Sequence, residues 1–308
     1  MPTTDPPPAA GQWLELSVES SAEAVDAIVE VFRSRGINGV AVEPSVSKGI
    51  DEGFTVVDGP CMVKAYIPLD DHSGEHVLEL DHALWHLRAF DLSPLSELRT
   101  TVVAEEDWAN AWKDHFHPVR LGQRIVIKPS WREFAANSDD IVLELDPGMA
   151  FGTGLHPTTR MVLEAMETCV LPGFSVFDVG TGSGILAVAA AKLGSASVLA
   201  VDTEPVAVRV ARENVVLNSA SELVTVREGS VEQGNATYDV VLANIIGSVI
   251  SEMAQDLARV LNPDGVLITS GIIAERLPMV EAAFADANLR IAERMQSDDW
   301  FCLIVNRQ

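Results

Sequence analysis

The sequence is poor in basic residues. It has 21 lysine and arginine residues against 45 aspartate and glutamate residues, so its formal net charge is −24. A surface this acidic repels phosphate backbones, and we therefore expect no direct contact with nucleic acid. The same charge would attract a basic protein partner, although it can also serve solubility alone.

Long apolar runs, cysteine and paired histidines are also scarce. No apolar run reaches the length of about 18 residues that a membrane-spanning helix requires, and residues 1–12 lack the pattern of a signal peptide. The three cysteines are far apart in the chain, which argues against a disulfide framework and fits a reducing compartment. No two of the seven histidines have clear ligand spacing, so we predict no metal site. A cytoplasmic protein without membrane association is expected.

The first third of the chain has the pattern of a small ferredoxin-like α+β domain over residues 13–104. A helix after Ser21 has apolar residues at helical spacing, and a second helix is predicted at 75–90. The order of strands and helices is βαββαβ, which is a common fold and indicates no function. Residues 1–12 are expected to form a disordered lead, and residues 105–117 a linker helix. The predicted strands lie at 13–18, 39–42, 61–67 and 98–104.

Residues 118–308 are predicted to form an α/β domain with a doubly wound parallel sheet. Two strands, at 124–131 and 139–145, come first, and helices then alternate with strands that are apolar almost throughout. Such strands are typical of a sheet covered on both faces. Two final strands, 291–296 and 300–305, are close enough to form an antiparallel hairpin at the sheet edge. The predicted parallel strands lie at 175–180, 197–202, 223–228, 238–244 and 265–271.

A glycine-rich turn between a predicted strand and a predicted helix carries the clearest chemical signal. Gly180, Gly182 and Gly184 have the spacing G-x-G-x-G, whereas the dinucleotide fingerprint is G-x-G-x-x-G. Asp202 ends the next strand, where a carboxylate can accept hydrogen bonds from ribose hydroxyls. Asp178 would repel a pyrophosphate but suits the cationic end of S-adenosylmethionine. The sequence therefore favours S-adenosylmethionine over NAD, and disfavours an NAD-dependent oxidoreductase.

Asn244 is the second candidate site residue. It ends a later parallel strand, at the edge of the sheet where α/β proteins bind their ligands. Its amide can both donate and accept hydrogen bonds, although a capping role is the alternative. The chain lacks the Asn-Pro-Pro-Tyr sequence typical of enzymes that methylate base amines or glutamine amides, so those substrates are disfavoured.

A family resemblance connects these signals. The segment DPGMAFGTGLHPTT at 146–159 is followed by FDVGTGSGILAVAAAKLG and VLANII, and preceded by WANAWKDHFHPVRLGQRIVIKPSW. From about residue 105 to the end, the chain resembles the ribosomal protein L-eleven methyltransferases. The N-terminal pattern matches the substrate-recognition domain of that family less specifically.

The resemblance implies a class I (Rossmann-like) S-adenosylmethionine-dependent methyltransferase domain. It implies transfer of methyl groups to lysine side chains and the N-terminal amine of a basic large-subunit ribosomal protein. Gly247 and Ser248 depart from the family pattern after Asn244, so the resemblance does not assign the residues at the rim of the substrate channel. By motif position, the cofactor contacts fall on Thr159, Gly180, Asp202 and Asn244, in the same site as Asp178, Gly182 and Gly184.

The resemblance also places residues at the transfer site. Phe151 and Thr153, the latter within the turn Gly152-Thr153-Gly154, are expected beside the reactive methyl group with Asn244. His156 is assigned a structural role in preference to contact with the amine. The alternative functions are methylation of lysine in another protein, methylation of a small amine, and a non-catalytic S-adenosylmethionine-binding module. We expect a monomer.

Overall fold

The computed structural model describes two compact units, which are considered separately. One ends at His117 and the other begins at Pro118. The predicted linker, apart from His117, lies outside the described residues, as does the predicted lead apart from Gln12, which belongs to the first strand. The described residues are 12–21, 24–35, 37, 40–43, 46–48, 54–56, 59–70, 73–87, 96–104, 117–145 and 156–308.

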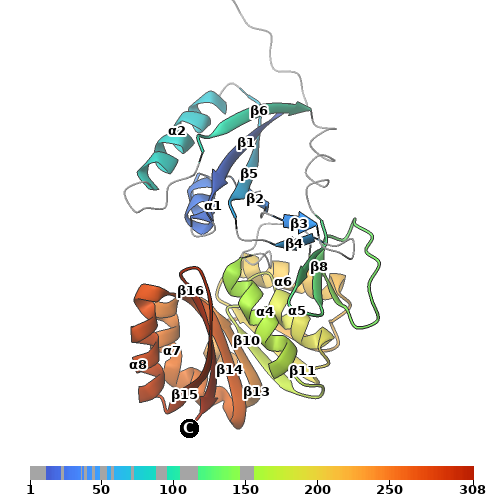
Figure 1. Ribbon diagram of the computed structural model, residues 1–308, viewed down its shortest axis with the longest axis vertical. Helices are drawn as coiled ribbons and strands as arrows, with labels where there is room; N and C mark the ends of the chain where they lie inside the picture. Colours follow the sequence, from blue (N-terminus) through green and yellow to red (C-terminus); the bar gives the residue numbers. More distant parts are fainter. Residues whose placement is uncertain are drawn as a thin grey trace, which may run out of the picture. The chain divides into compact units, whose positions relative to one another are not determined.

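The first unit contains a four-stranded antiparallel sheet in the order β2-β5-β1-β6, with two helices (Figure 1). Alternate residues of the first strand, such as Leu16 and Val18, are buried in a core with Ile28 and Phe32 of the first helix. This alternation is why the segment forms a strand with one face covered. The element bounds are β1 Gln12–Ser20, α1 Val25–Arg33, β2 Val40–Glu43, β5 Cys61–Pro68, α2 Ser73–His86 and β6 Arg99–Ala104.

The predicted order βαββαβ is incomplete, because two short strands lie between β2 and β5. These are β3 Val46–Lys48 and β4 Phe54–Val56, which pair in antiparallel fashion. Each has only three residues. Three residues are too few for the period-two pattern by which strands are recognised.

The second unit contains a seven-stranded sheet in the order β12-β11-β10-β13-β14-β16-β15. The strands from β12 to β14 are parallel, and β16 is antiparallel to both of its neighbours. The chain order reverses between β10 and β13, which is the position where doubly wound folds bind ligands. The predicted fold class and the final hairpin are confirmed. The strands are β10 Ser175–Val179, β11 Ser197–Asp202, β12 Val224–Glu228, β13 Tyr238–Asn244, β14 Leu261–Ile273, β15 Leu289–Ser297 and β16 Trp300–Arg307.

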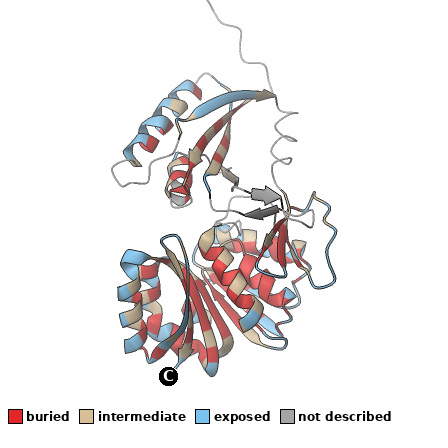
Figure 2. Ribbon diagram, viewed as in Figure 1, coloured by how far each residue is buried: buried red, intermediate tan, exposed pale blue. Residues whose placement is uncertain are grey.

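Helices cover both faces of this sheet (Figure 1). Buried side chains of the central strands, including Val241, pack against Leu257 and Phe284 from the helices on one face. Burial is concentrated in the strands and in the helix sides that face them (Figure 2). No helix among the described residues is long and apolar enough to cross a membrane. One group of helices is α4 Pro157–Cys169, α5 Ile185–Lys192 and α6 Pro205–Leu217; the other is α7 Gly247–Val260 and α8 Leu277–Asp286, with short 3-10 turns η2 Val231–Gln233 and η3 Ala274–Arg276.

Three short strands precede α4, and they correct one prediction. They are β7 Val119–Leu121, β8 Ile125–Lys128 and β9 Ile141–Glu144, and they belong to a small sheet in which β8 pairs with β7 in antiparallel and with β9 in parallel fashion. The strand predicted at 124–131 ends at Lys128, and β7 was not predicted. Pro129 cannot donate a hydrogen bond to a neighbouring strand, which favours an end to pairing at that point.

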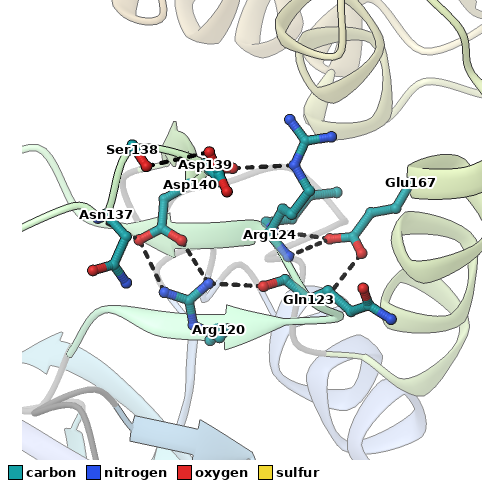
Figure 3. Close-up of polar contacts among 9 residues, drawn as sticks. Arg120, Gln123, Arg124, Asn137, Ser138, Asp139, Asp140 and Glu167 are labelled. Atoms are coloured by element: carbon teal, nitrogen blue, oxygen red, sulfur yellow. Dashed lines mark hydrogen bonds and ion pairs between the residues drawn. The ribbon is translucent and has the colours of Figure 1, made fainter.

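The turn between β7 and β8 is held by a carboxylate of α4 (Figure 3). Glu167 accepts hydrogen bonds from the backbone N–H groups of Gln123, Arg124 and Ile125 at 2.8–2.9 Å. A Cβ atom at Gly122, where φ is +67°, would lie 2.9 Å from the Glu167 carboxylate. The glycine therefore gives the turn its left-handed conformation and leaves room for the carboxylate.

An ion pair connects the strand β7 to the segment before β9. Arg120 contacts Asp140 through two hydrogen bonds of 2.7 and 2.9 Å between its guanidinium and the carboxylate (Figure 3). The hydrogen bond from Arg120 is the main reason why the pKa of Asp140 is lowered. Two parallel bonds of this kind fix direction as well as distance.

Side chains from the helices of the large sheet contact β9. The amide of Asn218, at the end of α6, accepts from the backbone N–H of Glu144 at 2.8 Å and donates to its carbonyl at 2.7 Å. Lys192, at the end of α5, donates to the carbonyl of Val142 at 2.8 Å. These contacts attach the small sheet to the larger one.

Candidate cofactor site

The glycine turn lies at the carboxyl end of β10. Gly180, Gly182 and Gly184 have φ angles of +76°, +55° and +80°, in the left-handed region that favours glycine. The N–H groups of Gly180 and Thr181 both donate to the carbonyl of Val201, at 2.9 Å. These bonds hold the turn against the end of β11.

The third glycine has a packing role. A Cβ atom at Gly184 would lie 3.0 Å from the Cα atom of Ala211 in α6. The glycine therefore allows α5 to begin close to α6. The spacing G-x-G-x-G differs from the dinucleotide fingerprint, but its last glycine also serves close packing, here between two helices.

Asp202 ends β11 and holds the turn through its carboxylate. Its Oδ2 atom accepts from the N–H of Gly182 at 2.9 Å, and its Oδ1 atom accepts from the N–H of Glu204 at 3.0 Å. A carboxylate has about four acceptor positions, so each oxygen can accept a further hydrogen bond. The side chain is thus oriented by the backbone and retains acceptor capacity. Its support of the glycine turn was not predicted.

Asp178 is completely buried beneath the same turn. Its Oδ2 atom accepts a 2.5 Å hydrogen bond from the hydroxyl of Thr181, whereas its Oδ1 atom has no hydrogen-bond partner within the described ranges. Burial is the main reason why the pKa of Asp178 rises to about 7, and the nearby charge of Asp202 raises it further. The hydrogen bond from Thr181 opposes this rise, and so, more weakly, does the backbone N–H of Ala187.

Asn244 and Thr159, which are 85 residues apart in the chain, meet at the end of β13. The Nδ2 atom of Asn244 donates to the hydroxyl of Thr159 at 3.1 Å. Thr159 lies in the first turn of α4, and only 1% of its surface is exposed. The structure therefore brings together two residues that the sequence assigned to one site.

Two glycines confine the residue that follows Asn244. A Cβ atom at Gly180 would lie 2.3 Å from the Cγ2 atom of Ile245, and one at Gly271 would lie 2.2 Å from the carbonyl oxygen of Ile245. Gly271 also has a φ of +86°. Ile245 is therefore held between the glycine turn and the end of β14. Gly271 was not predicted as a site residue, although it is the last residue of a predicted strand.

His156 caps α4, a contact that agrees with the structural role favoured by the sequence. It precedes α4, and its Nδ1 atom accepts a hydrogen bond from the N–H of Thr158 at 3.3 Å and lies 2.8 Å from the Thr158 hydroxyl. The ring centroids of His156 and Trp300 are 5.0 Å apart in an edge-to-face arrangement. Trp300 was not predicted to lie near this site. Phe151, Thr153 and the rest of residues 146–155 lie outside the described residues.

The chemistry of these residues fits S-adenosylmethionine. Asp202 retains acceptor positions that suit ribose hydroxyls. Asp178 supplies a buried carboxyl oxygen without a partner in the described chain, and two neighbouring carboxylates favour a cationic ligand over a pyrophosphate. The set therefore suits a ligand that combines a ribose with a positively charged group.

Comparisons with known proteins agree with this geometry. The model of the family described as ribosomal protein L11 methyltransferase (PrmA) matches residues 12–308. A ribosomal protein L11 methyltransferase of Chloroflexus aurantiacus is 45% identical, over 96% of this chain and 98% of the relative. Another, from Herpetosiphon aurantiacus, is 44% identical, over 94% of this chain and 97% of the relative.

A solved structure is also similar. The ribosomal protein L11 methylase of Lactobacillus delbrueckii subsp. bulgaricus is 34% identical in sequence, with a TM-score of 0.59. The match covers 63% of this chain and 100% of that chain.

Proposed function

The chain belongs to the family of ribosomal protein L11 methyltransferases, and we propose that it transfers methyl groups from S-adenosylmethionine to amino groups of ribosomal protein L11. The proposed targets are lysine side chains and the N-terminal amine. The observation that carries the proposal is the meeting of Asp202, the glycine turn and the Asn244–Thr159 pair at one edge of the sheet.

The proposed roles in cofactor binding follow from these contacts. Asp202 accepts hydrogen bonds from the ribose hydroxyls, and the backbone of the glycine turn, at Gly180, Gly182 and Gly184, permits close approach of the ligand. A cationic ligand beside Asp178 lowers its raised pKa, so that with the cofactor bound the carboxylate provides a negative charge for the cationic end. Thr159 and Asn244 complete the site from α4 and β13.

The chemistry requires a neutral amine beside the methyl donor. S-adenosylmethionine, when bound, supplies a methyl group on a positively charged sulfur atom. The lysine pKa in solution is about 10.4, so the site must favour loss of one proton. Burial of the amine lowers its pKa, and Asn244 can orient the amine through its amide oxygen. Phe151 and Thr153 are proposed to border the transfer site, and positioning then supplies much of the rate.

The N-terminal unit gives a reason to expect a macromolecular substrate. We propose that residues 13–104 recognise the ribosomal protein and that residues 105–117 connect this domain to the methyltransferase domain at 118–308. A small amine would not require such a domain. The acidic chain and the basic substrate would attract each other. A monomeric enzyme in the cytoplasm, where ribosomes are present, is the corresponding proposal.

A labelling experiment tests the function. The protein is incubated with S-adenosylmethionine carrying a radiolabelled methyl group and with ribosomal proteins from cells that lack this enzyme. We expect a single labelled basic protein, identified as L11 by mass spectrometry. Label on a different protein would support another lysine methyltransferase. Cofactor binding without transfer to any protein would support a non-catalytic module.

A further inference from the structure

Trp300 lies at the same end of the large sheet as the candidate cofactor site, the end where the parallel strands have their carboxyl termini. It is the first residue of β16 and pairs with Ile273 of β14. Three residues earlier in β14, Ser270 pairs with Asn244. The β14–β16 pairing thus brings the beginning of the last strand close to the end of β13.

The imidazole of His156 must keep a particular orientation to cap α4. To accept the N–H of Thr158, its Nδ1 atom must be unprotonated, so the ring proton is on Nε2. Rotation of the ring about its bond to Cβ would move Nδ1 away from the helix. The usual capping residues Ser, Thr, Asp and Asn have no such ring to orient.

Trp300 supplies the contact that restricts this rotation. The two rings meet edge to face, with an interplanar angle of 77° and 5.0 Å between their centroids. This arrangement is favourable for aromatic rings and depends on their relative angle. The orientation of His156 is therefore coupled to β16.

Hydrogen bonding by the indole N–H is not the reason for a tryptophan at position 300. The Nε1 atom is buried and has no hydrogen-bond partner in the part of the chain that the structure describes. A buried donor without a partner costs free energy. The ring contact with His156, which a phenyl group can also make, is a favourable interaction of this side chain.

We propose that Trp300 is a positioning residue of the cofactor site, which acts by holding His156 in the orientation that caps α4 and aligns Thr159 with Asn244. A chain of contacts supports it: Trp300 touches His156, His156 caps the helix, and Thr159 in the first helical turn accepts a hydrogen bond from Asn244. The inference rests on the proposed function, because it assumes that Thr159 and Asn244 contact the cofactor.

The first test compares cofactor affinities by calorimetry with S-adenosylhomocysteine. We expect Trp300→Leu to weaken binding about three- to tenfold, the effect of losing one aromatic pair. Trp300→Phe should bind as the wild type does. Phe301→Leu is the matched control, because it removes an aromatic ring from the next position of the same strand, packed against the core of α7 and α8. It should leave the affinity within about twofold.

A double-mutant cycle tests whether Trp300 acts through His156. His156→Asn keeps a capping side chain without a ring to orient. In that background, Trp300→Leu should have less than half of its effect on the logarithm of the dissociation constant. Equal effects in both backgrounds would show that Trp300 does not act through His156, and would overturn the proposal.

The ring contact itself has a spectroscopic signature. The ring protons of His156, assigned by their loss in His156→Asn, should shift in Trp300→Leu but keep most of their displacement in Trp300→Phe. If Trp300→Leu fails to fold by circular dichroism, Trp300→Met takes its place. Wild-type binding with unchanged affinity in Trp300→Leu overturns this inference alone. Absence of binding by the wild type would overturn the proposed function as well.

Discussion

Asp178 combines full burial with a carboxyl oxygen that has no partner among the described residues. Its pKa is raised from 3.8 to about 7, mainly by burial. In the folded protein it therefore keeps its proton up to about pH 7, whereas the unfolded chain releases it near pH 4. Folding binds a proton in this window, so the contribution of Asp178 to stability falls as the pH rises through it.

This linkage predicts the behaviour of Asp178→Asn in the absence of cofactor. The amide has the same shape, can accept from Thr181 and does not ionise. The free energy of unfolding of the variant, relative to the wild type, should increase from pH 5 to pH 7 and level off above that. Urea denaturation at several pH values measures this difference. A difference that does not vary with pH would show that the carboxyl ionises normally.

Substitution of Asp202 should weaken cofactor binding, and a carboxylate on the neighbouring strand provides a matched control. Asp202→Ala removes the acceptor for ribose and the support for the N–H of Gly182, and it should weaken S-adenosylhomocysteine binding by at least about tenfold. Glu228→Ala removes an exposed carboxylate at the end of the neighbouring strand, paired in register with Asp202. Calorimetry should find nearly unchanged affinity for Glu228→Ala. Similar losses in both variants would indicate a general effect of charge.

The elements of the large sheet follow closely from the sequence, because long apolar strands and capped helices have strong periodic signals. β11 ends at Asp202 and β13 ends at Asn244, as predicted. The three-residue strands β3, β4 and β7 were missed, since pairing with other strands rather than local pattern determines them.

The residues of the candidate site also fall into two groups: those that a sequence pattern indicates, and those that only the pairing of strands brings to the site. The glycine turn directly follows a strand, and Asp202 and Asn244 are the last residues of strands, positions that can be recognised in a sequence. Trp300 and Gly271 reach the site only through the pairing of β14 with β16 and the approach of Ile245. No local pattern indicates such contacts, because they depend on which strands become neighbours.

Because Glu167 of α4 holds the β7–β8 turn, its substitution should destabilise the protein more than substitution of Glu164 in the same helix. Glu167→Gln replaces one carboxylate oxygen by a donor that faces a backbone N–H, and should lower the free energy of unfolding by about 1–3 kcal/mol. Glu164→Gln alters only a partly exposed pair with Arg160 and should cost about 0.5 kcal/mol or less. Urea denaturation measures both.

Hydrogen exchange supplies the local readout. The amides of Gln123, Arg124 and Ile125 should exchange faster in Glu167→Gln but not in Glu164→Gln. Unchanged exchange in Glu167→Gln would contradict the role of the carboxylate in holding the turn.

At the scale of the whole molecule, the net charge of −24 should govern the encounter with a basic substrate. Methylation of L11 at subsaturating concentration should slow several-fold between about 50 and 300 mM salt, because ions screen charges over about 10 Å or less. The affinity for S-adenosylhomocysteine should change much less. A methylation rate independent of salt would show that electrostatic attraction does not contribute to substrate recognition.

The contacts of Asn218 and Lys192 with β9 also affect how molecules meet one another. The amide of Asn218 occupies both backbone hydrogen-bonding groups of Glu144, as a neighbouring strand would, and Lys192 occupies the carbonyl of Val142. β9 is the last strand of its sheet, and unpaired groups at such a border invite strands from other chains. The side chains that attach this sheet thus also leave these backbone groups closed to a strand of another molecule.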